Sequence, residues 1–268
     1  EDGNMGLMER LRIDGKGAIG TGAGRGVGRG IALALAEGGA TVVCSARTRS
    51  EIDDTVREIS GVGGRALAVT ADVMQERELQ ALVDATLRDC GRLDIVINNA
   101  GGNDYKPFLD IRAEEFRHHF DWNTTSAFLL SRIATPALLA QGGGVILNIS
   151  SGAGHIGIRG MLSYCVAKAG LDHLTRSLGE ELAPKIRVNG LALGAIMTPA
   201  LQQTFDMDAG FRETLIGKTP LKKVGNATDI GLAALFLCSP AAEYITGATL
   251  NIDGGLQDTN LPFRLPDL

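Results

Sequence analysis

A serine, a tyrosine and a lysine in the second half of the chain have the types and the spacing needed for proton transfer. Tyr164 and Lys168 are four residues apart, and Ser151 lies thirteen residues before Tyr164. Residues four apart lie on one face of a helix, so the Lys168 ammonium can favour the ionised form of the Tyr164 phenol. Such a phenol is a general acid or base for alcohol and ketone chemistry, and the Ser151 hydroxyl can give the reacting oxygen a second hydrogen bond.

A glycine-rich turn at residues 21–28 lies between a short apolar run and a helical stretch. Glycines in such a turn let the main chain bend tightly and approach a pyrophosphate at the helix N-terminus. The position of the turn therefore predicts dinucleotide binding. The residues expected at the phosphates are Gly22, Gly24, Arg25, Gly26, Val27 and Gly28.

The residues after the second apolar run bear on the choice between NADP(H) and NAD(H). A site selective for NAD(H) usually has an acid there, which bonds the adenosine ribose hydroxyls. This chain has Ala46 followed by Arg47, with Arg25 in the phosphate turn. Two guanidiniums can bind a 2′-phosphate through charge-assisted hydrogen bonds. We therefore expect NADP(H), the alternative being that both arginines are solvated surface residues.

Short apolar runs alternate with amphipathic helical stretches along the chain. This alternation predicts an α/β fold: a single-domain, Rossmann-like, doubly wound parallel sheet of about seven strands with helices on both faces. The expected strands are residues 17–21, 41–45, 65–70, 94–98, 145–150, 187–191 and 249–252. The expected helices are residues 27–37, 51–60, 76–90, 113–139, 163–183 and 228–238.

Residues 13–256 are expected to form this one domain. Residues 1–12 are expected to be an N-terminal arm or a remnant of expression, and residues 257–268 a C-terminal tail. The segment at about 194–225 carries apolar residues among polar ones and follows the end of a strand. Because ligands bind at the carboxyl ends of strands in such sheets, we predict that this segment is a substrate lid.

Composition argues against several classes of protein. The net charge of −5 disfavours nucleic acid and anionic membranes as partners. The chain shows neither an apolar run long enough to span a membrane nor the pattern of a signal peptide. The cysteines lack a CxxC spacing, so we expect free thiols in a reducing cytoplasm and no metal site. They are Cys44, Cys90, Cys165 and Cys238.

These motifs together resemble the short-chain dehydrogenase/reductase family, over residues 14–255. The matching segments are residues 21–28, 98–101, 123, 151, 164–168, 187–190 and 253–255. The resemblance implies that Tyr164 is the acid/base and that Ser151 orients the substrate oxygen. It also implies that Lys168 binds the nicotinamide ribose and lowers the pKa of the phenol, while Asn123 holds a water that links Lys168 to solvent.

Further cofactor contacts follow from strand ends and from the family pattern. Asp72, after the third predicted strand, can accept a hydrogen bond from the adenine amino group, or it can cap a turn. The remaining expected cofactor residues are Val73, Asn99, Ala100, Gly101, Tyr164, Lys168, Gly194, Ile196 and Thr198. Two residues depart from the family pattern: Gly20 replaces an apolar β-branched residue, and Leu193 replaces a proline.

Substrate choice is expected to rest on the segment between Ser151 and Tyr164 and on the lid. The wall is predicted to be largely apolar, with His155 as a polar group that either lines the substrate site or faces solvent. The expected substrate-lining residues are Gly102, His155, Met161, Met197, Leu201 and Phe205.

Within the family, the scaffold segments resemble bacterial 7α-hydroxysteroid dehydrogenases. That resemblance favours NADP(H)-dependent interconversion of a secondary alcohol and a ketone on a bulky alicyclic substrate. A 3-oxoacyl thioester reductase is the main alternative, and it would need a basic patch for acyl carrier protein. Lys218, Lys222 and Lys223 could form that patch. A further alternative is an NADP(H)-binding redox sensor or scaffold. The family resemblance also implies a homotetramer, with residues 113–139 and 163–183 at one interface.

Overall fold

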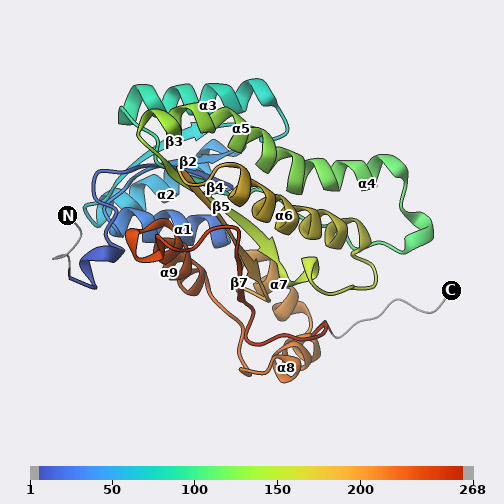
Figure 1. Ribbon diagram of the computed structural model, residues 1–268. Coiled ribbons are helices and arrows are strands. Elements are labelled where there is room, and N and C mark those ends of the chain that lie inside the picture. Colours follow the sequence, from blue (N-terminus) through green and yellow to red (C-terminus); the bar gives the residue numbers. More distant parts are fainter. Residues whose placement is uncertain (1–5, 262–268) are drawn as a thin grey trace.

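A single sheet of seven parallel strands forms the centre of the protein, as predicted (Figure 1). The computed structural model describes residues 6–261. The strands are β1 (Gly17–Thr21), β2 (Thr41–Ala46), β3 (Arg65–Thr70), β4 (Ile95–Asn98), β5 (Gly144–Ser151), β6 (Ile186–Leu193) and β7 (Thr249–Ile252). Their order in the sheet is β3-β2-β1-β4-β5-β6-β7.

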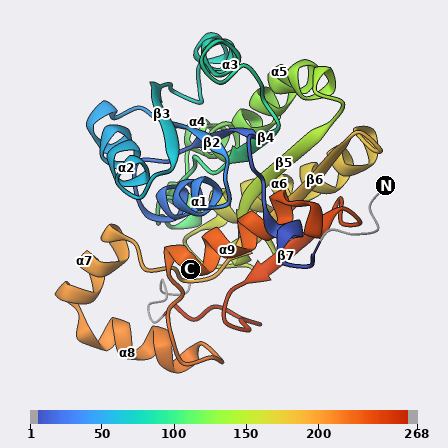
Figure 2. The same ribbon diagram turned by 90° about the vertical axis from the view of Figure 1, so that its left-hand side faces the viewer.

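Helices cover both faces of this sheet, which confirms the doubly wound α/β fold (Figures 1 and 2). One face carries α1 (Gly26–Glu37), α2 (Arg49–Gly61) and α9 (Ala227–Cys238). The other carries α3 (Glu76–Cys90), α5 (Ser126–Ala140) and α6 (Leu162–Glu181). Parallel strands covered on both faces are apolar along their length, and all of β1 is accordingly buried.

The strand order reverses between β1 and β4, and this reversal opens a crevice at the carboxyl ends of the two strands. Thr21 at the end of β1 ties the two strand ends together. Its hydroxyl donates to Ile97 O at 3.1 Å and accepts from the amides of Asn99 and Ala100 at 3.0 and 3.1 Å. The crevice therefore has a fixed floor.

The predicted single helix at residues 113–139 is wrong in one respect. The structure has α4 (Ala113–Phe120), a π-helical turn (Asp121–Thr125) and then α5. The wider turn places Asn123 so that its amide exchanges two hydrogen bonds with the main chain of Gly102. Helical periodicity in a sequence does not report such a turn, since its cause lies in a distant loop.

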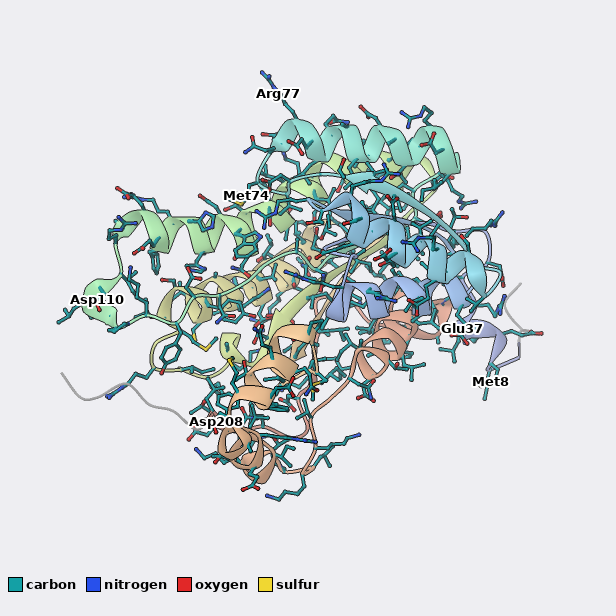
Figure 3. The ribbon with its side chains drawn as sticks, turned by 180° about the vertical axis from the view of Figure 1, so that it is seen from behind. Met8, Glu37, Met74, Arg77, Asp110 and Asp208 are labelled. Atoms are coloured by element: carbon teal, nitrogen blue, oxygen red, sulfur yellow. The ribbon has the colours of Figure 1, made fainter. Side chains whose placement is uncertain are left out.

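The predicted lid contains two helices that the sequence analysis missed, α7 (Pro199–Met207) and α8 (Ala209–Lys218). The Thr198 side chain caps α7, and the Asp208 side chain caps α8. Figure 2 shows both helices projecting from the body of the domain. Figure 3 shows Asp208 at their junction, on the opposite side of the molecule from Arg77 of α3.

Both terminal segments contact the domain where the structure describes them. Glu9–Leu11 forms a 3₁₀ turn, and Arg10 pairs with Glu243. Near the other end, Asn260 Nδ2 donates to Thr219 Oγ1 at 2.9 Å, beside the lid. The rest of the predicted arm and tail, residues 1–5 and 262–268, lies outside the described residues.

The close packing of α1 on α9 generates the first prediction. A β carbon at Gly231 would lie 2.7 Å from Gly30 O and 2.8 Å from Ala34 Cβ. We expect Gly231→Ala to lower the free energy of unfolding by about 1–3 kcal/mol, as overpacking does. The control is Gly61→Ala at the end of α2, which meets no atom within 4 Å. Urea unfolding followed by circular dichroism compares the two, and equal stabilities would contradict the packing.

Candidate active site

The glycine-rich turn at the end of β1 is shaped by contacts that exclude side chains. Gly22 and Gly26 have φ angles of 62° and 53°, which favour glycine. A β carbon at Gly22 would lie 2.7 Å from Asn99 Nδ2, and one at Gly28 would overlap Gly22 O. Because Asn99 Nδ2 donates to Thr21 O at 2.9 Å, the turn is held against the end of β4.

A cavity of about 540 Å³ follows this turn along the crevice. Its volume and its place at the switch point suit a dinucleotide. The predicted cofactor residues that line it are Gly22, Gly24, Arg25, Gly26, Val27, Gly28, Arg47, Asp72, Val73, Asn99, Ala100, Gly101 and Thr198.

Four predicted cofactor residues do not line this cavity: Tyr164, Lys168, Gly194 and Ile196. Gly194 is paired to β7 through its amide, which donates to Ile252 O at 3.1 Å. Ile196 lines a second cavity of about 430 Å³ at the base of the lid. The sequence analysis also missed several lining residues of the first cavity. These are Ala46, Thr48, Glu51, Ala71, Trp122, Pro199 and Gln203.

Charged groups meet at the end of the cavity next to β2. Arg25 Nη1 lies 3.4 Å from Glu51 Oε1, and the Arg25 side chain is 74% exposed. An exposed pair of this kind is worth roughly 0–1 kcal/mol, so an anionic ligand can displace it. Arg47 and Glu51 both line the cavity. Glu51 lies in the first turn of α2, which follows β2. The start of a helix at this point was the sequence signal that could have placed Glu51 at the cavity.

Asp72 caps a turn and also lines the cavity. Its Oδ1 accepts from Met74 N at 3.0 Å, which is the turn-capping role. The residue nevertheless lines the cavity, beside Val73. Its adenine contact stays a prediction.

The three residues expected to handle the proton come together at the end of β5. Ser151 is the last residue of β5, and its hydroxyl shares a hydrogen bond with the Tyr164 phenol from α6. Lys168, one turn further along α6, places Nζ 5.6 Å from the centre of the Tyr164 ring. The spacing in the sequence is therefore realised as one cluster.

Asn123 holds its place next to this cluster through main-chain contacts. Its Oδ1 accepts from Gly102 N at 3.1 Å, and its Nδ2 donates to the carbonyls of Gly102 and His119, each at 2.9 Å. A β carbon at Gly101 would overlap Asn123 Oδ1 and lie 3.5 Å from Lys168 Nζ. Asn123 and Lys168 thus both lie close to the α carbon of Gly101.

The expectation that Lys168 lowers the pKa of the phenol is not met by the protein's own groups. Burial raises the pKa of Tyr164, and the hydrogen bond from Ser151 opposes that shift only in part. Burial also lowers the pKa of Lys168 to about 8. The Lys168 ammonium donates a hydrogen bond to Ile149 O at 2.8 Å, so this bond goes to the main chain.

The expected substrate-lining residues are distributed over several contacts. His155 Nε2 lies 3.2 Å from Asp172 Oδ2, and Gly102 packs on the Trp122 ring. Phe205 is buried in the lid's own cluster with Phe211 and Leu215. The other two lid residues, Met197 and Leu201, pack against that cluster, whereas Met161 lies partly buried just before α6. None of the six is placed against a substrate by these contacts, so their role stays a prediction.

The two departures from the family pattern are accommodated. A β carbon at Gly20 would meet only Ala23 Cβ, at 3.7 Å, so nothing in the structure requires a glycine there. Leu193 continues β6 in register with Ile252, and it is buried. Within the part of the chain that the structure describes, no group of side chains suits a metal ion. Nor is any helix between residues 6 and 261 long and apolar enough to cross a membrane.

The raised pKa of the phenol gives a direct prediction. In the cofactor-free protein, we expect Tyr164 to ionise above the ordinary pKa of about 10, because burial disfavours the phenolate. Ultraviolet difference spectroscopy against pH, with Tyr164→Phe as the reference, isolates this one ionisation. A phenolate signal appearing near neutral pH would contradict the expected direction.

Comparisons with known proteins agree with this geometry. A family model described as enoyl-(acyl carrier protein) reductase matches residues 21–257. The 7alpha-hydroxysteroid dehydrogenase of Escherichia coli (strain K12) is 42% identical over 254 residues, which cover 94% of this chain and 98% of that protein. A 3-oxoacyl-(acyl-carrier-protein) reductase FabG of Thermotoga maritima is 31% identical over 247 residues, covering 92% and 99%.

A solved 7α-hydroxysteroid dehydrogenase, complexed with NADH and 7-oxo glycochenodeoxycholic acid, superimposes with a TM-score of 0.89 at 42% identity. The match covers 92% of this chain and 96% of that one. Sequence, sheet order and active-site geometry therefore lead to one conclusion: the chain belongs to the short-chain dehydrogenase/reductase family, and it is an oxidoreductase.

Proposed function

We propose that this protein is an NADP(H)-dependent oxidoreductase that interconverts a secondary alcohol and a ketone on a bulky alicyclic, hydroxysteroid-like substrate. The observation that carries the proposal is the hydrogen-bonded pair of Ser151 and Tyr164, with Lys168 beside it. Lys168 is close to Gly101, where a β carbon would lie 3.5 Å from its Nζ, and Gly101 lines the cavity whose glycine turn suits a dinucleotide.

In the direction of ketone reduction, the cofactor supplies a hydride to the carbonyl carbon. The carbonyl electron pair then moves onto oxygen, and the Tyr164 hydroxyl donates its proton there. The Ser151 hydroxyl gives the same oxygen a second hydrogen bond, which holds it toward Tyr164. In the reverse direction, the same phenol accepts the proton of the alcohol, so one residue serves both.

Lys168 is placed to support this transfer. Its ammonium lies beside the Tyr164 ring, where a positive charge favours the phenolate over the protonated phenol. A positive nicotinamide adds a second favourable charge in the oxidised cofactor complex, and the protein's own groups alone do not lower the pKa of the phenol. Asn123 faces the same space across Gly101, where a water would connect Lys168 to solvent.

The choice of NADP(H) rests on the residues after β2. Ala46 leaves no carboxylate directly at the strand end, while Arg47 and Arg25 line the cavity there. A 2′-phosphate would draw Arg25 away from Glu51, whose exposed pair is weak. The solved relative is complexed with NADH, so cofactor preference is where we expect this chain to differ from it.

The substrate proposal follows from the relatives. The alternative, a 3-oxoacyl thioester reductase, is supported by the FabG relatives but requires a basic patch for acyl carrier protein. Lys218 Nζ donates to Leu261 O at 3.3 Å, and Lys222 donates to Gly217 O. All three lysines of that patch are exposed, so the preference for the alicyclic substrate rests on the hydroxysteroid dehydrogenase relatives. A redox sensor or scaffold fits less well, since the whole proton-transfer cluster is present.

Assembly and location belong to the same proposal. We expect a homotetramer, because partly exposed apolar side chains gather on α4, α5 and α6. They are Phe120, Phe128, Leu139, Leu162 and Val166. Four unpaired cysteines agree with a reducing cytoplasm.

The reaction is tested with NADPH and two ketone classes, a 7-oxo bile acid and a 3-oxoacyl thioester. We expect the bile acid to be reduced with the higher kcat/KM. Tyr164→Phe should lower kcat by more than about 100-fold, because it removes the proton donor. Tyr244→Phe is the matched control, since Tyr244 is fully exposed. Turnover that survives Tyr164→Phe would contradict the mechanism, and preference for the thioester would support the alternative.

The cofactor proposal has its own test. We expect Arg47→Asp to lower kcat/KM for NADPH by about 10-fold or more, since a charge-assisted bond to phosphate becomes a repulsion. Glu51→Gln should raise the affinity for NADPH, because Arg25 is released and a nearby negative charge is lost. Affinity for NADH should change little in Glu51→Gln. The proposal would be overturned if the wild type had equal kcat/KM for NADPH and NADH and if Arg47→Asp left both values unchanged.

A further inference from the structure

A third ionisable residue lies on the face of α6 that carries Tyr164 and Lys168. Asp172 follows Lys168 by four residues, just as Lys168 follows Tyr164. The three side chains therefore form one row along the helix. Asp172 is 9% exposed and Lys168 is 4% exposed, so both charges are withdrawn from water.

The Asp172 carboxylate lies under the segment that follows β5. His155 Nε2 approaches its Oδ2 to 3.2 Å, and a β carbon at Gly154 would lie 2.5 Å from the same oxygen. Ser150 and His155 both favour the ionised carboxylate. Among the described residues, neither oxygen of the Asp172 carboxylate completes a well-aligned hydrogen bond. The Ser150 hydroxyl donates to Lys168 O at 3.5 Å.

A buried carboxylate with so few partners is costly unless a positive charge compensates it. Burial raises the pKa of Asp172, and Lys168 is one of the groups that oppose this shift. The relation is mutual, because Asp172 opposes the fall in the pKa of Lys168. Cys165 and Asp172 both act on the Tyr164 phenol in the same direction, raising its pKa.

We propose that Asp172 is a positioning residue that acts through Lys168: its carboxylate retains the proton on the buried ammonium, and His155 connects that carboxylate to the segment between Ser151 and Tyr164. This proposal deepens the proposed function and rests on it for the role of Lys168. The mechanism above requires a charged Lys168 beside the phenol. Ile149 O accepts a hydrogen bond from the Lys168 ammonium but carries no net charge that would compensate it.

The negative charge of Asp172 favours the protonated form of Lys168 at neutral pH. With a pKa of about 8, the ammonium is mostly charged at neutral pH. Removing the Asp172 charge would favour the neutral amine, so the proton would be lost at lower pH. Below that range Lys168 stays protonated either way, and the variant should behave like the wild type.

The direct test follows the ε-carbon of Lys168 by NMR of ¹³C-lysine-labelled protein against pH, with Lys168→Met assigning the signal. The wild-type midpoint is expected at about 8. In Asp172→Asn, which keeps the shape of the side chain, the midpoint should fall by about one pH unit or more. His173→Gln is the matched control, since His173 is the next residue of α6 and is exposed.

Activity gives a second readout that a merely structural role would not produce. The alkaline limb of kcat/KM for ketone reduction should move to lower pH in Asp172→Asn, with little change at acid pH. Asp172→Glu should restore part of the shift. A wild type that reduces no ketone would end the proposed function, yet the Lys168 titration would still decide this proposal.

Three outcomes would overturn the role of Asp172. The first is an unchanged Lys168 midpoint in Asp172→Asn, and the second is a loss of activity that is uniform across pH. Asp172→Ser, smaller and neutral, replaces the asparagine variant if that one does not fold. Unfolding of both variants is the third, because the proposal assigns Asp172 to the proton equilibrium of Lys168 and not to the packing of α6.

Discussion

Lys168 carries an ammonium group into the interior, where it is 4% exposed, and such a charge is costly unless it is bonded and compensated. Ile149 O at the end of β5 accepts its hydrogen bond at 2.8 Å. That contact fixes α6 to the carboxyl end of the sheet and thereby places Tyr164 beside Ser151. The Asp172 carboxylate on the same helix face supplies the opposite charge. The proton-transfer cluster therefore depends on the contacts of Lys168 with Ile149 O and with the charge of Asp172.

The sheet brings this cluster to the cofactor crevice. β1 and β4 are neighbours at the point where the strand order reverses, and Thr21 at the end of β1 bonds to the end of β4. The π-helical turn before α5 then delivers Asn123 to the main chain of Gly102, across Gly101 from Lys168. The glycine turn and the proton-transfer cluster are thus both placed at strand ends. Helices α7 and α8 follow β6.

The sequence predicted well whatever depends on local pattern. The apolar runs of parallel strands located all seven strands, and the Tyr164–Lys168 spacing located the cluster, because period and position on a helix are local properties. The π-helical turn was missed because helical periodicity does not distinguish it from an α-helical turn, and the hydrogen bonds of Asn123 to Gly102 are contacts between separate segments. The α7 and α8 helices were missed although Pro199 and Asp208 are start signals that could have been read.

Contacts between distant segments were beyond the sequence. His155 was expected as a polar group in the substrate wall or at the surface, and its approach to Asp172 depends on how the segment after β5 folds onto α6. Glu51 enters the cavity only because α2 begins against the glycine turn. The pKa of Tyr164 likewise depends on burial, which raises it in the cofactor-free protein and which no spacing of residues reports.

Hydride transfer from the cofactor to a carbonyl carbon, completed by a proton from Tyr164, is the central claim. The most direct measurement reduces a 7-oxo bile acid with NADPH that carries deuterium at both C4 positions of the nicotinamide ring and analyses the alcohol by mass spectrometry. The account predicts a single deuterium on the new carbinol carbon in the wild type. An alcohol formed without deuterium would contradict it.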